Sequence, residues 1–342
     1  MSVAVVILNW NGKAFLEQFL PLVVTHTGSD AEIYVADNAS TDDSIKFLKE
    51  KFPAVHLVQN PLNGGFAVGY NMSLTQIKAD YYVLLNSDVE VTPNWVRAPV
   101  EMLERNKDVM AVQPKIKSYF DSKSFEYAGA AGGFLDVYGY PFCRGRIFDT
   151  IEKDEGQYNQ ASEIFWASGA CLFIRSSVFH EMGGFDEDLF SHQEEIDLCW
   201  RMKLKGYKIM YCPNSEVLHY GGGSLPKSNP FKTYLNFRNN LIIICKNHPT
   251  RALKQIVFQR LTLDGLAAVR FLFKGDFGDF WAIARAHGHF YRTFRKTWKK
   301  RQAVQASVTN PEVSTIYRRS IVRKYFMEGK KLFSQLDSKD FY

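Results

Sequence analysis

Along the first part of the chain, short apolar runs typical of buried strands alternate with segments in which apolar residues recur at helical spacing. A continuous, mostly β-branched run at Val3–Leu8 predicts a parallel strand that is buried on both faces, and further strands are predicted at Glu32–Ala36, Val55–Gln59 and Tyr81–Leu85. Apolar residues at helical spacing separate these runs and predict helices at Lys13–Val24, Ile45–Lys51 and Ala67–Ile77. A helix between successive parallel strands implies right-handed crossovers. We therefore predict an α/β fold, with helices on both faces of a doubly wound mixed sheet.

The carboxyl ends of these strands carry polar side chains, namely Asn9, Asp37, Asn60 and Asp88. Ligands of doubly wound sheets bind beyond this edge. We therefore expect a nucleotide to bind there.

The pattern changes twice further along the chain. From about residue 118 to residue 160 it loosens into Gly, Tyr and acidic residues, which predicts a mobile loop or an insert. Regular spacing then returns, with a helix predicted at Glu194–Lys205 and a strand at Lys208–Cys212. Beyond Pro230 the chain becomes helical and basic.

Charge divides the 342-residue chain into two parts. Its net charge is +6, but residues 1–240 hold 22 Lys and Arg against 29 Asp and Glu, and residues 241–342 hold 20 against 7. We predict a catalytic body at 1–240, with halves at 1–115 and 116–240, and a basic helical tail at 241–342. A basic segment favours phosphate, in nucleic acid or in anionic lipid.

The tail has the pattern of a surface-binding segment. Charged residues interrupt every apolar run of Ala252–Ala286, so the pattern is amphipathic, and no run reaches the roughly 18 residues that span a bilayer. Aromatic and basic residues mix at Phe290–Arg301, which suits an anionic leaflet. A solvated helix and a dimerisation arm are the alternatives. No nucleic-acid-binding module is recognisable.

Cysteine usage and the N-terminus bear on the compartment. The five cysteines are scattered, odd in number and without a CxxC pair, which favours a reducing compartment over a disulfide framework or zinc site. The first residues lack the basic region of a signal peptide and begin a strand instead. We expect a cytoplasmic protein, peripheral at the inner face of the cytoplasmic membrane.

Several ordered motifs carry candidate chemistry. They are Val5–Gly12, Val35–Asp42, Asn60–Asn71, Leu84–Asp88, Trp166–Arg175 and Glu194–Arg201. Taken in this order, they resemble the inverting glycosyltransferases of family 2, and in particular its rhamnosyltransferase-like members. The resemblance spans about residues 1–240 and implies the fold called GT-A.

The resemblance implies a donor site at the strand ends. In the family, the first strand end and the Asp after the second strand hold the pyrimidine, and a carboxylate suits the N3–H of uracil or thymine. Leu84–Asp88 occupies the position of the metal-binding Asp-x-Asp motif, with Asn86 in place of the first Asp. One carboxylate is enough for Mg²⁺ or Mn²⁺ when the donor diphosphate supplies other oxygens. The donor residues so implied are Asn9, Asp37, Asn63, Gly65, Asn86, Ser87 and Asp88.

The resemblance also implies an acceptor site. The family's catalytic base falls at Glu195, where Asp is usual, with Asp197 and Glu194 as alternates. Trp166 and Gly169 would contact the acceptor, since a glycine lets it lie against the backbone. His219 would complete the metal site with Asp88, and a structural histidine is the alternative. Lys232 and Arg238 are suited to phosphate but equally to surface charge.

The implied function is metal-dependent transfer of a sugar, with inversion, from a nucleoside diphosphate (dTDP-rhamnose or a UDP-hexose) to a lipid-linked or cell-surface glycan. The substitutions at Asn86 and Glu195 leave open an inactive scaffold at the membrane. A nucleotidyltransferase that makes sugar nucleotides is a second alternative. It normally carries Arg and Lys in its first loop, where this chain has Asn9–Gly12.

Overall fold

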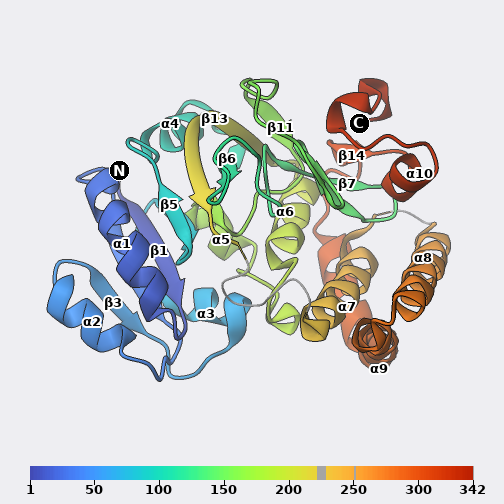
Figure 1. Ribbon diagram of the computed structural model, residues 1–342, viewed down its shortest axis with the longest axis horizontal. Coiled ribbons are helices and arrows are strands. Elements are labelled where there is room, and N and C mark those ends of the chain that lie inside the picture. Colours follow the sequence, from blue (N-terminus) through green and yellow to red (C-terminus); the bar gives the residue numbers. More distant parts are fainter. Residues whose placement is uncertain (222–228, 250–251, 342) are drawn as a thin grey trace.

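The computed structural model describes residues 1–221, 229–249 and 252–341 (Figure 1). Within them, the main sheet has nine strands. Eight follow the order β11-β13-β6-β12-β4-β1-β2-β3, and β5 pairs with β13. The strands are β1 (Val3–Asn9), β2 (Glu32–Asp37), β3 (His56–Gln59), β4 (Tyr81–Asn86), β5 (Val89–Val91), β6 (Val109–Ser118), β11 (Ser162–Ile164), β12 (Cys171–Arg175) and β13 (Lys208–His219).

The sheet is mixed, as the sequence predicts. β1 pairs in parallel with β2 and β4, and β2 with β3, while β12 runs antiparallel to β4 and β6. The helices of this part are α1 (Lys13–Thr27), α2 (Ser44–Lys51), α3 (Gly65–Leu74), α4 (Arg97–Arg105), α5 (Ser176–Glu181) and α6 (Glu194–Leu204). Two buried clusters, one on each side of the sheet strands, hold these helices against it. The helices between the first strands fall where the apolar spacing predicts them.

Residues 118–160 form an ordered insert, which is one of the two alternatives that the sequence leaves open, rather than a mobile loop. They contain β7 (Gly133–Asp136), β8 (Pro141–Cys143), β9 (Arg146–Ile147) and β10 (Thr150–Ile151). These strands form a second sheet, in the order β10-β9-β8-β7-β14. The strands are too short for an alternating pattern to stand out, because each places only one or two side chains on either face.

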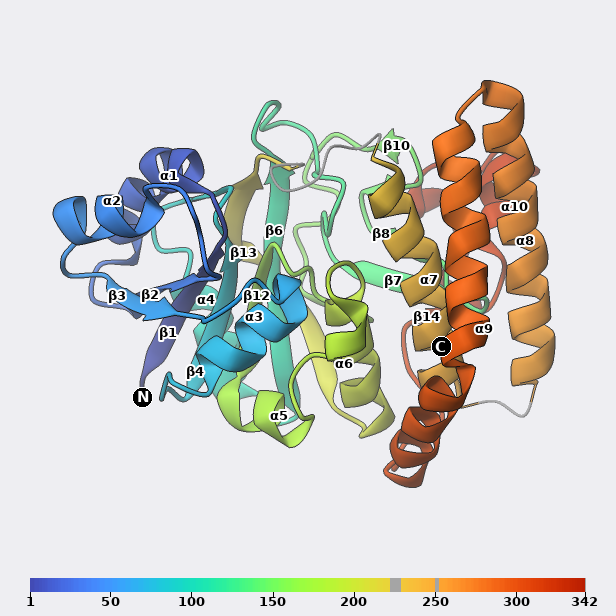
Figure 2. The same cartoon turned by 90° about the horizontal axis from the view of Figure 1, so that it is seen from below.

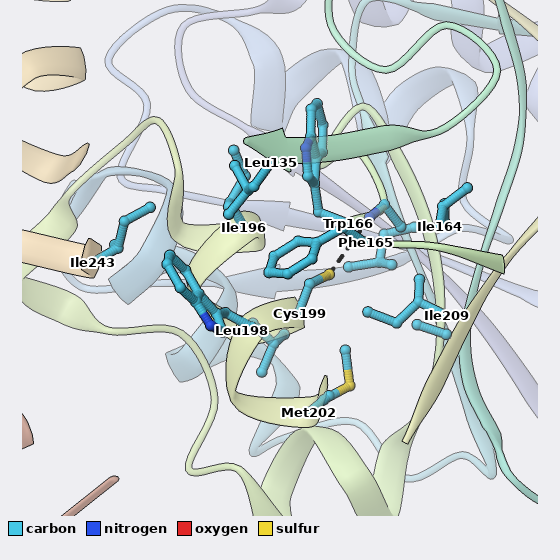
Figure 3. Close-up of a cluster of buried hydrophobic side chains, with 14 of the residues drawn as sticks. Leu135, Ile164, Phe165, Trp166, Ile196, Leu198, Cys199, Met202, Ile209 and Ile243 are labelled. Atoms are coloured by element: carbon cyan, nitrogen blue, oxygen red, sulfur yellow. Dashed lines mark hydrogen bonds between the residues drawn. The ribbon is translucent and has the colours of Figure 1, made fainter. Parts of the chain in front are cut away.

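A shared apolar cluster joins the second sheet to α6 (Figure 3). Phe165 and Trp200 meet edge to face, with ring centres 5.6 Å apart. Trp166 is only 3% exposed, and its Nε1 donates to the carbonyl of Phe134 at 3.0 Å. This cluster continues into the C-terminal helices through Ile243 of α7.

Three helices form a wall at the end of the molecule opposite α1 and α2 (Figure 2). They are α7 (Pro230–Asn247), α8 (Leu253–Lys274) and α9 (Phe277–Ala306), followed by β14 (Ile316–Tyr317) and α10 (Ile321–Phe326). α7 runs across the predicted domain boundary at residue 240, and β14 pairs with β7. None of the described helices is long and apolar enough to cross a membrane.

Buried ion pairs tie this wall to the body. Lys246 of α7 contacts Asp197 of α6 at 2.6 Å and Asp186 at 2.5 Å, and all three side chains are at most 5% exposed. Asp186 also pairs with Lys300 of α9. A buried carboxylate that loses its partner is costly. The tail therefore packs as part of the folded body, and truncation after residue 240 would remove both ion-pair partners of Asp186 and the Lys246 partner of Asp197.

We predict that Lys246→Met lowers the free energy of unfolding by about 3 kcal/mol, because it leaves a buried charge on Asp197 less well compensated. Arg201 remains as a second partner of Asp197, at 2.9 Å, which limits the loss. Chemical denaturation measures the change. Lys299→Met removes an exposed charge of α9 and should change stability little; equal losses in the two variants would contradict the role given to Lys246.

Candidate active site

The first strand ends form one polar cluster, as the sequence predicts. Asn9 and Asp37 are register partners on β1 and β2, and both are fully buried. Asn9 Nδ2 donates to Asp37 Oδ2 at 3.1 Å and to Ser40 Oγ at 3.2 Å. Asn9 Oδ1 has no hydrogen-bond partner among the described residues. An unsatisfied buried acceptor at this edge is suited to a donor group on a ligand.

The glycine-rich turn before α3 binds another part of the protein. The amides of Phe66 and Ala67 donate to the carbonyl of Phe190, at 2.8 and 3.2 Å. Gly65 has φ +74°, and a Cβ there would lie 2.6 Å from the same carbonyl. The turn thus joins the donor half to the loop before α6, and Asn63 supports it by accepting from the Gly65 amide at 2.9 Å.

Asp88 and His219 come together at the end of β4 and β13. Asp88 Oδ1 lies 3.2 Å from His219 Nε2, and both residues are 7% exposed. Asn86 and Ser87 precede Asp88 at the edge of the sheet and are partly buried. The sequence predicts that β13 ends at Cys212, before His219. In the structure this strand continues through a bulge after Cys212, and His219 is its last residue. The Gly-rich run that follows His219 lies mostly outside the described residues.

Glu126 completes this group and was missed by the sequence analysis. Its Oε2 lies 3.4 Å from His219 Nδ1. Although burial opposes it, the carboxylates of Glu126 and Asp88 raise the pKa of His219 to about 10. No motif marks Glu126, since it lies in the irregular segment after β6 and reaches His219 only through the fold.

The geometry of this group fits a divalent cation. Two ligand atoms 3.2 Å apart can occupy adjacent positions around an ion to which each bonds at about 2.1 Å. Glu126 would then hold the second ring nitrogen of His219, as carboxylates commonly do behind metal-bound histidines. Among the described residues no group of three or more His, Cys, Asp or Glu is arranged as a complete metal site. Other ligands would have to come from substrate or water.

The acids at the start of α6 have contrasting surroundings. Glu194 is 4% exposed, and its Oε2 has no hydrogen-bond partner among the described residues. Burial, followed by the charge of Glu195, raises the pKa of Glu194 well above its usual range. Burial also raises the pKa of Glu195 to about 7, while backbone amides at the helix start oppose the shift. Glu195 can therefore exchange a proton near neutral pH.

Asp197 lies in a different environment and is fully buried among cations. Arg201 donates to it at 2.9 Å and Asn247 at 2.7 Å, and Lys246 lies 2.6 Å away. Arg201 contacts one oxygen of the carboxylate, and Asn247 and Lys246 contact the other. Asp197 therefore anchors α6, and its oxygens are occupied.

The loop before α6 has a strained backbone. Phe190, His192 and Gln193 have positive φ values, of 62°, 68° and 70°. Such conformations cost energy for residues other than glycine and persist only where neighbours enforce them. Asn239 of α7 does so by donating to the carbonyls of Leu189 and His192 at 2.9 and 2.7 Å, and it also bonds the Ser191 carbonyl.

The two predicted acceptor contacts have different positions. Trp166 is part of the core described above, so its side chain does not support the predicted contact with an acceptor. Gly169 lies against Phe66, and a Cβ there would be 3.1 Å from the ring. Phe66 also packs on Tyr70, with ring centres 4.7 Å apart. A side chain at position 169 would therefore require the Phe66 ring to move by a few tenths of an ångström.

Comparison with known proteins identifies the family of the part of the chain that holds the donor half of this site. The family model described as Glycosyl transferase family 2 matches residues 4–183. The chain is similar to the N-acetylglucosaminyl-diphospho-decaprenol L-rhamnosyltransferase of Mycobacterium tuberculosis, at 26% identity over 71% of this chain and 84% of that protein. It is also similar to the dTDP-rhamnosyl transferase RfbF of Shigella flexneri, at 22% identity over 75% and 85%.

Solved structures support the fold. Staphylococcus aureus TarS 1-349 in complex with UDP matches with a TM-score of 0.53 and 15% identity, over 90% of this chain and 91% of that one. The mannosyltransferase PcManGT of Pyrobaculum calidifontis, in complex with GDP-Man and Mn²⁺, also matches with a TM-score of 0.53 and 15% identity, over 89% and 85%. The predicted GT-A fold is confirmed.

Proposed function

Because this chain belongs to glycosyl transferase family 2, we propose that it transfers rhamnose from dTDP-rhamnose to a lipid-linked glycan precursor. The similar rhamnosyltransferases support this donor, and the decaprenol-dependent relative supports a lipid-linked acceptor. A UDP-hexose is the alternative donor. The observation that carries the proposal is the position of Glu195, a half-buried carboxyl group whose pKa is raised to about 7, at the start of α6 next to the loop that contacts the donor half.

Each part of the site then has a role. Asp37 and Asn9 hold the base of the nucleotide, and Asn63 and Gly65 shape the turn beside it. Glu195 removes the proton from the acceptor hydroxyl as that oxygen attacks the anomeric carbon from the face opposite the diphosphate. Glu194, kept neutral by burial, avoids a second negative charge next to the base. Asp197 positions the helix.

Asp88 and His219 are the proposed protein ligands of a divalent cation, Mg²⁺ or Mn²⁺. When bound, such a cation would neutralise charge on the departing diphosphate. The GDP-Man and Mn²⁺ complex of a structural neighbour supports this choice.

The wall of C-terminal helices is proposed to lie on an anionic membrane surface. Exposed apolar side chains recur at helical spacing on α8, at Phe258, Leu266, Val269 and Phe273, and on α9, at Phe277, Trp281, Tyr291 and Trp298. The described residues 253–306 carry eleven Lys and Arg against three Asp. Exposed apolar groups among cations are typical of membrane interfaces. A homodimer through these helices is the alternative.

We predict that Glu195→Gln lowers turnover roughly 10²–10⁴-fold without weakening donor binding, because the amide cannot accept the proton. In the unmodified enzyme, protonation of Glu195 below pH 7 removes the base, so kcat/KM should fall about tenfold per pH unit on that side. A coupled assay of released dTDP or UDP measures both. Glu187→Gln, at an exposed acid of the neighbouring loop, is the matched control. An active Glu195→Gln enzyme with an unchanged pH profile would refute this assignment of the base.

We predict that Mn²⁺ and dTDP or UDP together raise thermal stability more than the sum of their separate effects, because Asp88 and His219 need the diphosphate to complete the cation's ligands. A ligand at a hundredfold its dissociation constant contributes about 2.7 kcal/mol. Asp88→Asn should abolish the joint gain, and Asp43→Asn, at an exposed loop acid, should keep it. A joint gain that survives in Asp88→Asn would exclude Asp88 as a ligand.

We predict that binding to vesicles requires anionic lipid and is lost in the triple variant Phe273→Ser, Phe277→Ser, Trp281→Ser. These three side chains are 87%, 60% and 63% exposed, so the fold should survive their replacement. Vesicle sedimentation measures binding, which should also weaken with salt. Phe120→Ser with Ile151→Ser removes exposed apolar groups elsewhere and serves as the control. A full-length protein that ignores such vesicles but becomes monomeric in the triple variant would support the dimer instead.

A further inference from the structure

Cationic side chains gather around Tyr234 between α7 and α9. The guanidinium carbons of Arg238 and Arg285 each lie 5.3 Å from the centre of the Tyr234 ring. The Tyr234 hydroxyl is 2.9 Å from Nδ1 of His289. Burial, followed by the charges of Arg238 and Arg292, lowers the pKa of His289. Arg238, Arg285 and His289 thus surround one aromatic ring, and Arg292 follows His289 by about one turn of α9.

This group is not neutralised by the protein. Within the described ranges, neither Arg285 nor Arg292 forms an ion pair, and both are exposed. Arg238 donates to the carbonyls of Asp188 and Leu189 rather than to a carboxylate. The carboxylate of Asp188, which is near His289, is itself engaged by lysines of α9.

Several cations of the C-terminal helices are paired with buried carboxylates, whereas Arg285 and Arg292 are among the exposed cations of α9 that form no ion pair within the described residues. Lys246, Arg260 and Lys300 each contact a buried carboxylate. Like charges repel, so a cluster left without counterions is unfavourable unless an anion binds there.

The cluster lies next to the acceptor side of the active site. Phe231, on the first turn of α7, packs on Phe190 with ring centres 6.4 Å apart. Gln193 donates to the carbonyl of Asn236 at 3.0 Å, and Glu195 follows two residues later. The turns of α7 that carry Tyr234 and Arg238 therefore border the loop that leads into the proposed base.

The other side of the cluster borders the exposed apolar residues of α9. Thr233 donates to Asp279 Oδ1 at 2.5 Å, which joins the start of α7 to the start of α9 between Phe277 and Trp281. Figure 2 shows α7 and α9 side by side along their length. A molecule with a sugar at Glu195 and a hydrocarbon chain at Phe277 and Trp281 would pass over the cluster.

We propose that Arg285, His289 and Arg292, with Arg238 and Tyr234, form a subsite for the diphosphate group of a prenyl-diphosphate-linked acceptor. The inference rests on the lipid-linked acceptor of the proposed function and identifies the group of that acceptor that this surface binds. Guanidinium groups match phosphate oxygens in pairs, and two of them side by side suit the adjacent phosphates of a diphosphate. The apolar residues beyond would take the first prenyl units.

The test measures binding of geranyl diphosphate by calorimetry, with UDP and Mn²⁺ present in excess so that the donor site is not available to the probe. Arg285→Gln with Arg292→Gln should weaken binding about tenfold or more, because charge-assisted hydrogen bonds are lost. Arg295→Gln with Lys299→Gln removes two exposed, unpaired charges of the same helix and should change binding by less than about threefold. Melting temperatures establish that both double variants are folded.

Two further measurements distinguish a prenyl diphosphate from other anions. Inorganic pyrophosphate should bind more weakly than geranyl diphosphate, because it lacks the prenyl chain. The affinity for phosphatidylglycerol vesicles should fall by no more in the Arg285→Gln, Arg292→Gln variant than in the control double variant. Displacement of geranyl diphosphate by UDP, equal losses in the two double variants, or equal binding of pyrophosphate would each overturn the proposal.

The subsite and the proposed function can fail separately. Selective binding of geranyl diphosphate by a protein that hydrolyses and transfers none of the sugar nucleotides supplied would support the subsite and refute the transferase activity proposed above. Sugar transfer to a soluble acceptor, together with binding that both double variants retain, would refute only the subsite.

Discussion

The arrangement of the acceptor half depends on how the charge of Asp197 is compensated. This carboxylate is fully buried in the first turn of α6, where an isolated charge would cost several kcal/mol. Its partners come from α6 itself, through Arg201, and from α7, through Lys246 and Asn247. Lys246 in turn binds Asp186, which also pairs with Lys300 of α9. A single buried acid thus requires that three helices from different parts of the chain meet.

This constraint separates the roles of neighbouring acids. Asp197 is surrounded by cations, while Glu194 is buried and Glu195 half-buried in the same helical turn, neither forms an ion pair among the described residues, and both have raised pKa values. Carboxyl groups whose surroundings push their pKa values apart can perform different tasks at one pH. The strained loop before them is held by Asn239, so the cations and amides of the C-terminal helices determine where the proposed base lies.

Local patterns in the sequence predict the donor edge well, because parallel strands bring consecutive strand ends together. Asn9, Asp37 and Asp88 follow from that rule, and the structure places them at one edge. Glu126 could not be predicted, since its contact with His219 depends on how an irregular segment crosses a bulged strand. The second sheet was missed because its strands are too short to show a period. Trp166 fits a motif, yet a side chain of that size is more often buried, as it is here.

The basic tail shows why total charge is a coarse guide to function. In the sequence, its lysines and arginines form one surplus, which suggests a single electrostatic role. In the structure, some of these side chains are buried against acids, while others are exposed to solvent. Lys246, Arg260 and Lys300 point inward to buried acids and contribute to folding, while Arg285 and Arg292 are exposed without a carboxylate partner. Only cations of the second kind leave their charge available to a ligand. The number that could bind an acceptor or a membrane is therefore smaller than the surplus suggests, and Arg285 and Arg292 share α9 with exposed aromatic residues.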